Sequence, residues 1–260
     1  MRLTRAAVGM CIAGVVFIGV PAAAQSPFLF ATQPTALGVR MVTAADAGYN
    51  VRAFEPVAGE RLEPRAAVAA TLSPLFSLQG QLGAASMLDR RTRVSEQMEL
   101  MMTPVRSGAI ALGSSFGVRH EYSGATAALA RVVGARTTGR SALAADVLIE
   151  HPFVSGRDAV DVITTVGATH ALTQRIWLGV EAVGSDLEGF WNSEEAEGGA
   201  TLLVGPTLAV AVSDHWRLVV GGGPVLRATT DHAMLEGNPS LALPSGRAGY
   251  VIRTSVRRAW

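Results

Sequence analysis

The sequence predicts an all-β protein, specifically a closed antiparallel up-and-down transmembrane β-barrel of 10–12 strands. Apolar residues recur at every second position in many short segments, which is the period of a strand with two different faces. Hydrophobic residues make up 49% of the chain and charged residues only 17%, and the mean hydropathy is +0.30. Beyond residue 24, no apolar run reaches the roughly 18 residues that indicate a membrane-spanning helix.

The first 24 residues have the three parts of a secretory signal peptide. Arg2 and Arg5 give a charged start, an uncharged apolar run follows over 6–20, and small residues end the segment, so we expect cleavage after Ala24. Cys11, the only cysteine, lies in the apolar run. The rest of the chain therefore has no thiolate for a metal site or for nucleophilic catalysis. We divide it into an N-terminal lead segment, 25–47, which is either a lead or a partial plug, and a barrel, 48–260.

The alternation is clearest near the C-terminus. Leu202, Val204, Leu208 and Val210 fall on one face of a strand, whereas small and polar residues such as Thr207 fall on the other. Counting back from the end, we expect strands at 48–56, 64–73, 75–85, 93–103, 108–119, 124–133, 141–150, 158–169, 174–184, 199–212, 215–227 and 246–260. Ten strands is the alternative, because 93–103 and 124–133 alternate poorly. Glu96 falls on the face that should meet lipid, which requires either a shifted register or a position at the rim.

The connections and the last strand carry a resemblance. Short turns at 171–173 and 213–215 alternate with long loops at 186–199 and 229–246. Tyr250, Ile252 and Val256 share a face with the terminal Trp260, and the segment resembles the closing strand of Gram-negative outer-membrane β-barrel proteins, which end in Phe or Trp. The resemblance implies a porin-like or transporter-like barrel in the cell outer membrane. It also implies partners: the secretion machinery, outer-membrane lipid and the barrel-assembly machinery that reads Trp260. From the residues alone, Trp260 is an interfacial anchor, and we also expect Tyr250 to be an interface residue.

The inward faces of the predicted strands carry five acids and six arginines. These lumen-lining candidates are Glu99, Arg131, Asp146, Glu150, Asp161, Arg175, Glu181, Arg217, Arg227, Arg253 and Arg257. Balanced charges can pair across strands and fill the lumen, because buried charges require partners. They can also line a wet passage, as in a porin constriction. The whole chain has 22 basic residues, all arginine, against 21 acids, so no basic field for nucleic acid is expected.

Three further motifs each have a structural interpretation and a functional one. The acidic loop 186–197 is either a solvated loop with an interfacial pair, Phe190 and Trp191, or a cation-binding lip. His120 lies at a predicted outer rim and His232 in a long predicted outer loop, and neither has a recognisable catalytic pattern. The glycines at 221–223 do not match a phosphate loop and favour a bend or a close approach of strands.

Together these observations leave four functional hypotheses. The first is a small channel or transporter for a hydrophobic or small polar solute. The second is a structural or surface-binding barrel with a closed, charge-filled lumen. The third is a surface lipid-modifying enzyme that uses His120 or His232, and the fourth is an exported soluble barrel that carries a ligand. We expect no cofactor, no metal and no catalytic residue. The sequence does not predict the oligomeric state.

Overall fold

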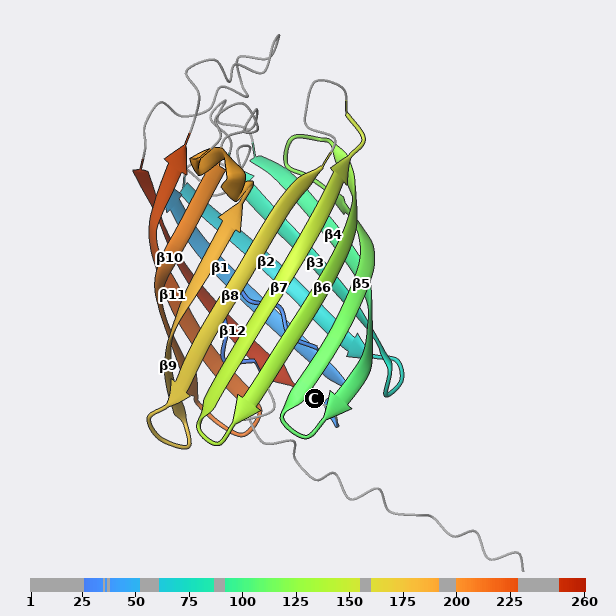
Figure 1. The fold of residues 1–260 in the computed structure, drawn as a ribbon, viewed down its shortest axis with the longest axis vertical. Coiled ribbons are helices and arrows are strands. Elements are labelled where there is room, and N and C mark those ends of the chain that lie inside the picture. The colour runs from blue at the N-terminus through green and yellow to red at the C-terminus, as the bar shows by residue number, and fades with distance from the viewer. Residues whose placement is uncertain are drawn as a thin grey trace, which may run out of the picture.

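The computed structural model describes residues 26–34, 36, 38–51, 61–86, 92–154, 160–191, 200–228 and 248–260. In these residues, twelve antiparallel strands form one closed barrel, in which each strand pairs with its sequence neighbours and β1 closes against β12 (Figure 1). The strands are β1 (Met41–Val51), β2 (Arg61–Thr71), β3 (Phe76–Ser86), β4 (Thr92–Ser107), β5 (Ile110–His120), β6 (Thr126–Thr138), β7 (Ser141–Pro152), β8 (Asp161–Ala171), β9 (Ile176–Ser185), β10 (Ala200–Ala211), β11 (Trp216–Ala228) and β12 (Ala248–Ala259). The predicted fold class is confirmed.

The two ends of the barrel differ in the length of their connections. At one end, which we call the short-turn end, the strands are joined by 72–75, 108–109, 139–140, 172–175 and 212–215, and the chain ends at Trp260 (Figure 1). At the other, the long-loop end, they are joined by 52–60, 87–91, 121–125, 153–160, 186–199 and 229–247. A short 3₁₀ helix, η2 (Leu187–Phe190), follows β9 at the long-loop end. This asymmetry is the one that the sequence predicted.

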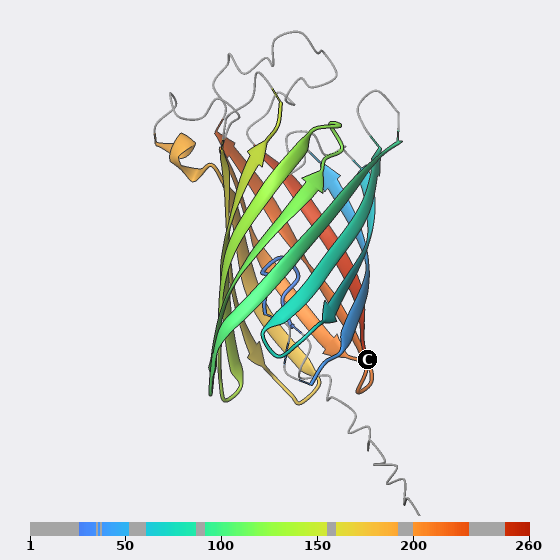
Figure 2. The ribbon, with the colours of Figure 1, turned by 90° about the vertical axis from the view of Figure 1, so that its right-hand side faces the viewer.

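The apolar stripe of each strand faces outward. In β10, Val204 and Leu208 are 42% and 41% exposed, whereas their neighbours Leu203 and Thr207 are each 1% exposed. Phe116 on β5, at 69% exposed, shows the same orientation. In the described part of the chain, no second sheet covers this outer surface (Figures 1 and 2). An apolar band around a closed barrel is the surface that hydrocarbon solvates and water does not.

The described residues include no helix with the length and hydropathy of a membrane span.

The first strand begins at Met41, not near residue 48 as the sequence suggested. Residues 41–47 carry alanine on both faces and Asp46 on the inner one, so their own alternation is weak. The pairing of β1 with both β12 and β2 imposes the strand nevertheless, because it supplies partners for the backbone on both sides. The predicted lead segment therefore loses its last seven residues, 41–47, to the barrel.

The two segments that alternate poorly are both strands, so the ten-strand alternative is wrong. The register of β4 shifts between Met102 and Val105, a bulge that contains Pro104 and reverses the inward and outward phases. In β6, Leu129 and Val133 face the lumen while alanines face outward. This is the reverse of the other strands, in which the large apolar side chains face outward. An analysis based only on a period of two detects neither the bulge in β4 nor the reversed pattern in β6.

Glu96 does face outward, and it lies at the rim. Its cross-strand neighbour is His120, the last residue of β5 at the long-loop end. A rim position removes most of the cost of a carboxylate on the outer surface.

The glycines at 221–223 mark a close approach of three strands. A Cβ on Gly222 would lie 2.0 Å from the carbonyl oxygen of Val251 in β12, and a Cβ on Gly205 would lie 1.8 Å from the carbonyl oxygen of Gly222. Gly222 also has a φ of 143°. The backbone reaches this arrangement only because both residues lack a Cβ.

Candidate functional site in the barrel lumen

An N-terminal strap lies inside the barrel. We use this name for residues 26–40, of which 26–34, 36 and 38–40 are described. Figure 2 shows this segment as a blue trace within the lumen, leading into β1 at the short-turn end. Its last residue is fixed there, because Arg40 donates its backbone N–H to the Trp260 carbonyl oxygen at 3.1 Å and accepts from the Thr71 N–H at 2.8 Å. The described strap residues therefore lie in the lumen, where the partial-plug interpretation would place them.

Glu181 on β9 holds the strap by its main chain. One carboxylate oxygen accepts the N–H of Leu29 at 2.7 Å, and the other accepts those of Phe30 at 2.7 Å and Ala31 at 2.8 Å. The Thr207 hydroxyl adds a bond of 2.6 Å from β10. Three successive N–H groups form a concave anion site, which suits a buried carboxylate.

A second carboxylate and one aromatic side chain complete the attachment. Asp146 on β7 accepts the N–H of Thr32 at 2.8 Å. Phe28 is fully buried and packs with Ala31 of the strap and Ala144 of β7. Gly167 on β8 makes room for the ring, because a Cβ there would lie 2.5 Å from Phe28 Cδ1.

Arg131 on β6 links the strap to a central ion-pair network. Its guanidinium donates to Glu99 on β4 at 3.1 and 3.2 Å, to Asp146 at 2.7 Å, and to the hydroxyl of Thr32 at 3.1 Å. The Ser115 hydroxyl also donates to Glu99. Both acids are almost fully buried, so the arginine provides the counter-charge that their burial requires.

Two more networks occupy the half of the lumen nearer the long-loop end. Glu63, which is 1% exposed, accepts from Tyr122 at 2.8 Å, from Arg253 at 2.9 Å and from Arg65 at 2.7 Å. In the second network, Arg119 of β5 pairs with Glu150 of β7 and with Glu121 at 3.4 Å. Pairing of this kind satisfies the buried charges and narrows the lumen.

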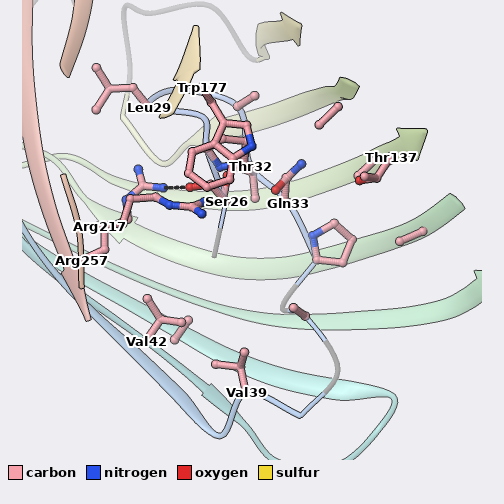
Figure 3. Close-up of a pocket in the computed structure, with 18 of the residues that line it drawn as sticks. Ser26, Leu29, Thr32, Gln33, Val39, Val42, Thr137, Trp177, Arg217 and Arg257 are labelled. Atoms are coloured by element: carbon pink, nitrogen blue, oxygen red, sulfur yellow. Dashed lines mark hydrogen bonds between the residues drawn. The ribbon is translucent and has the colours of Figure 1, made fainter. Parts of the chain in front are cut away.

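The half nearer the short-turn end is different, because it contains a cavity of about 1070 Å³. Its lining combines strap residues such as Thr32 and Gln33 with the walls of the barrel (Figure 3). The charged residues that line it are Arg106, Arg140, Arg175, Arg217, Arg257, Glu99 and Asp214. Arginines outnumber acids five to two, so the cavity has an excess of positive charge.

Arg217 and Arg257 are two cavity arginines on neighbouring strands of the barrel. Arg217 on β11 is 1% exposed, and its guanidinium lies over the ring of Trp177 on β9, 4.3 Å from the centroid. Arg257 on β12 donates to the Ser26 carbonyl oxygen at 3.2 Å (Figure 3). It also donates to the Ser255 hydroxyl at 3.0 Å. These contacts orient both guanidinium groups inside the lumen.

The structure brings most of the predicted lumen-lining residues together. Buried inside the barrel are Glu99, Asp146, Glu150, Asp161, Glu181, Arg217, Arg227 and Arg253, and half-buried are Arg131 and Arg257. Arg175 is different, because β9 begins at Ile176 and leaves it exposed in the preceding turn, at the edge of the cavity. The prediction that it lies on a strand face is wrong, since the strand is shorter than the alternation suggests.

Sequence reasoning missed several charged and polar residues of the lumen. Arg119 lies on the inner face of the predicted strand 108–119, so its position alone could have identified it. Glu63 lies one residue before the predicted strand 64–73, and Tyr122 follows β5 in a loop. Both were hidden by uncertainty about where strands end.

The other sequence candidates do not form a site in the described residues. Asp186 has a φ of 47° and accepts the Val162 N–H at 2.9 Å, which ties β9 to β8. Trp191 is 76% exposed, and the glutamates of the acidic loop at 194, 195 and 197 lie outside the described residues. His232 also lies outside them. His120 lies 3.4 Å from the Thr126 hydroxyl, and the described part of the chain shows no cluster of three or more metal-ligating side chains.

Tyr250 and Trp260 lie on the outer surface at opposite ends of the barrel. Tyr250 is 43% exposed near the long-loop end, with the Tyr49 ring centroid 6.2 Å from its own. Trp260 is 48% exposed at the short-turn end, and the Arg258 guanidinium lies 3.4 Å from its ring centroid. Aromatic side chains at the two edges of an apolar band are typical of membrane interfaces.

Comparison with known proteins shows which solved structures have a similar fold. No protein-family model and no curated protein matches the sequence. Among solved structures, the NanC porin is similar, with 7% identity, a TM-score of 0.59, and 83% of this chain and 98% of that chain covered. The KdgM porin in complex with disordered oligogalacturonate has 9% identity and a TM-score of 0.58, with 84% and 99% covered. The chain thus has the closed barrel fold of outer-membrane porins.

Proposed function

We propose that the protein is an outer-membrane channel for a small solute. The observation that carries the proposal is the cavity of about 1070 Å³ inside a closed barrel with an apolar exterior. In this proposal residues 1–24 direct export and are removed, and Trp260 is read by the barrel-assembly machinery. The short-turn end faces the periplasm, as in other barrels with this loop asymmetry.

The strap constricts this channel. It is held mainly by hydrogen bonds from its backbone to Glu181 and Asp146, and water can replace such bonds at a modest net cost. Phe28 is its main apolar anchor. Movement of the strap towards the periplasm would join the cavity to the rest of the lumen.

A reversible disulfide tests the proposal in planar lipid bilayers. Ala31→Cys with Ala144→Cys places one thiol on the strap and one on β7, within the same buried cluster. The only native cysteine, Cys11, lies in the signal segment, so no other thiol interferes. We expect discrete conductance steps from the wild type and from the reduced variant, and a severalfold smaller conductance after oxidation, with each single-cysteine variant as the control.

A closed barrel is the second candidate, because the ion-pair networks of Glu63 and Arg119 fill the half of the lumen that the cavity does not reach. Silence from the wild type, from the reduced variant and from a variant without residues 26–39 would favour this structural or surface-binding role. Recovery of the protein from the periplasm without detergent would instead favour a soluble ligand carrier.

We propose no catalytic role. Ser141 and His170 lie 3.0 Å apart, but no carboxylate of the described residues bonds to the His170 ring, and both side chains of the pair are exposed. Measurable lipid hydrolysis by the wild type, abolished by His120→Ala, would contradict this part of the proposal.

A further inference from the structure

The outer face of β12 carries a charge close to its C-terminal end. Ile252, Val256 and Trp260 are exposed along this face, and Arg258 lies among them as the charged residue. Arg258 is the second-last residue of the strand, so it lies at the short-turn rim and not at the middle of the barrel. An outward-facing arginine is tolerated at the level of the lipid headgroups, whereas it is strongly unfavourable at the bilayer midplane.

Two tryptophans hold the Arg258 guanidinium, and we call these three residues the rim cluster. The guanidinium lies 3.4 Å from the ring centroid of Trp260 and 5.4 Å from that of Trp216, its cross-strand partner on β11. The indole N–H of Trp260 donates to the Thr43 hydroxyl on β1 at 3.4 Å, which fixes this ring. A guanidinium that stacks on aromatic rings keeps its N–H donors in its own plane, directed away from those rings.

The charge of the rim cluster is not neutralised by the protein. Within the described part of the chain, the Arg258 guanidinium contacts aromatic rings but forms no ion pair, and its Nε is buried without a hydrogen-bond partner. The five short turns, all of them described, contain Arg140 and Arg175 but a single acid, Asp214. This end of the barrel therefore presents an excess of positive charge to the headgroups of the adjacent leaflet.

The wall next to the rim cluster, towards the middle of the barrel, is apolar. Val256 is exposed on the same face of β12, two residues from Arg258, and Leu218 is its cross-strand partner on β11. A ligand with a negative head and a hydrocarbon tail can therefore contact the guanidinium and the apolar wall together. A free anion gains only the first of these two contacts.

We propose that the rim cluster binds an anionic phospholipid of the adjacent leaflet, with its phosphate against the Arg258 guanidinium and an acyl chain along Val256. The planar N–H fork of an arginine matches the oxygens of a phosphate. A zwitterionic lipid also carries a cation beside its phosphate, which the arginines of this end repel, so a lipid with net negative charge is preferred. The rim cluster lies on the outer surface, and the inference is therefore independent of whether the barrel conducts.

Quenching of tryptophan fluorescence by brominated lipids measures binding at the rim cluster, because Trp216 and Trp260 belong to it. The full-length barrel is refolded into vesicles that contain phosphatidylglycerol or phosphatidylcholine brominated on an acyl chain. A Trp191→Phe background removes the exposed tryptophan of the long-loop end, and Trp177 lines the cavity inside the barrel (Figure 3). Phosphatidylglycerol should be preferred about fivefold, the contribution of one arginine near a charged bilayer surface.

Arg258→Gln should abolish this preference. Arg136→Gln is the matched control, because Arg136 is an exposed, outward-facing arginine at the same end of the barrel on β6, six strands away from β12 in either direction. It should leave the preference at Trp216 and Trp260 unchanged. Heat-modifiable migration on gels confirms that each variant is folded.

Three results would overturn the proposal. The first is equal quenching of the Trp191→Phe barrel by the two lipids at matched mole fractions, which is decisive even if Arg258→Gln does not fold. The second is loss of the preference when inorganic phosphate is added at constant ionic strength, since the site would then take a free anion and not a lipid. The third is an equal loss in Arg136→Gln, which would show that general surface charge, and not the rim cluster, attracts the lipid.

Discussion

Arg131 is the residue on which most of the buried charge at the centre of the lumen depends. It bonds to Glu99 on one side, to Asp146 on the other and to Thr32 of the strap. Its removal leaves two acids facing each other without a counter-charge. Breaking a buried pair costs far more than the pair contributes relative to apolar residues, because the partner left behind stays desolvated.

Arg131→Met should therefore lower the free energy of unfolding by about 3–5 kcal/mol. The matched control is Arg136→Met in the same strand, whose exposed side chain faces outward and whose replacement should change stability by no more than about 0.5 kcal/mol. Urea unfolding of the barrel in lipid vesicles, followed by tryptophan fluorescence, measures both. Equal effects would show that the network around Arg131 is not stabilised by ion pairing.

The alternation of single residues predicted much of this site. Asp146 and Glu150 are inward on β7 because Leu143, Val147 and Ile149 are outward, and period-two arithmetic is enough to place them. It could not predict that Asp146 binds the strap. That bond joins residues 114 apart in sequence, and no local pattern encodes it.

At the scale of elements, the fit between β8 and the strap depends on one glycine. Gly167→Val should push Phe28 away from the wall, because even a Cβ would lie 2.5 Å from the ring. Conductance should rise and the strap should become sensitive to protease. Gly134→Val in β6 is the control, since a Cβ there would meet only Leu112, at 3.4 Å. Unchanged protease sensitivity in Gly167→Val would contradict the proposed packing of the strap.

The close approach of β10, β11 and β12 gives a sharper prediction. Gly222→Ala would place a Cβ 2.0 Å from a carbonyl oxygen and force an unfavourable φ. We expect the free energy of unfolding to fall by about 2–4 kcal/mol, which is measured as a low yield of heat-modifiable barrel on refolding. Gly108→Ala serves for comparison: Gly108 has a φ of 54° with no atom within 4 Å of its added Cβ, so its cost is confined to the backbone.

Strand existence was more predictable than strand limits. All twelve segments proposed from alternation overlap a strand, yet β1 begins earlier and β4 extends further than expected. In β1 the pattern is blurred by alanine on both faces, and in β4 the bulge at Pro104 reverses the phase. In both cases the neighbouring strands, and not the segment itself, determine where pairing stops.

At the scale of the whole molecule, the apolar exterior should respond to charge according to depth. Val180 lies in the middle of β9 and is 49% exposed, whereas Leu72 is 61% exposed in a short turn. Val180→Arg should weaken folding into vesicles by about 2–4 kcal/mol, and Leu72→Arg by no more than about 1 kcal/mol. Equilibrium folding in urea measures both. Similar costs at the two positions would show that the exterior does not meet hydrocarbon.

The strap is made first, but its partners are made much later. Its contacts with Glu181 join residues 150 to 152 apart, so the main chain of Leu29, Phe30 and Ala31 finds its acceptors only after the chain through β9 exists. We therefore expect the leading segment of the polypeptide to be anchored late in biogenesis.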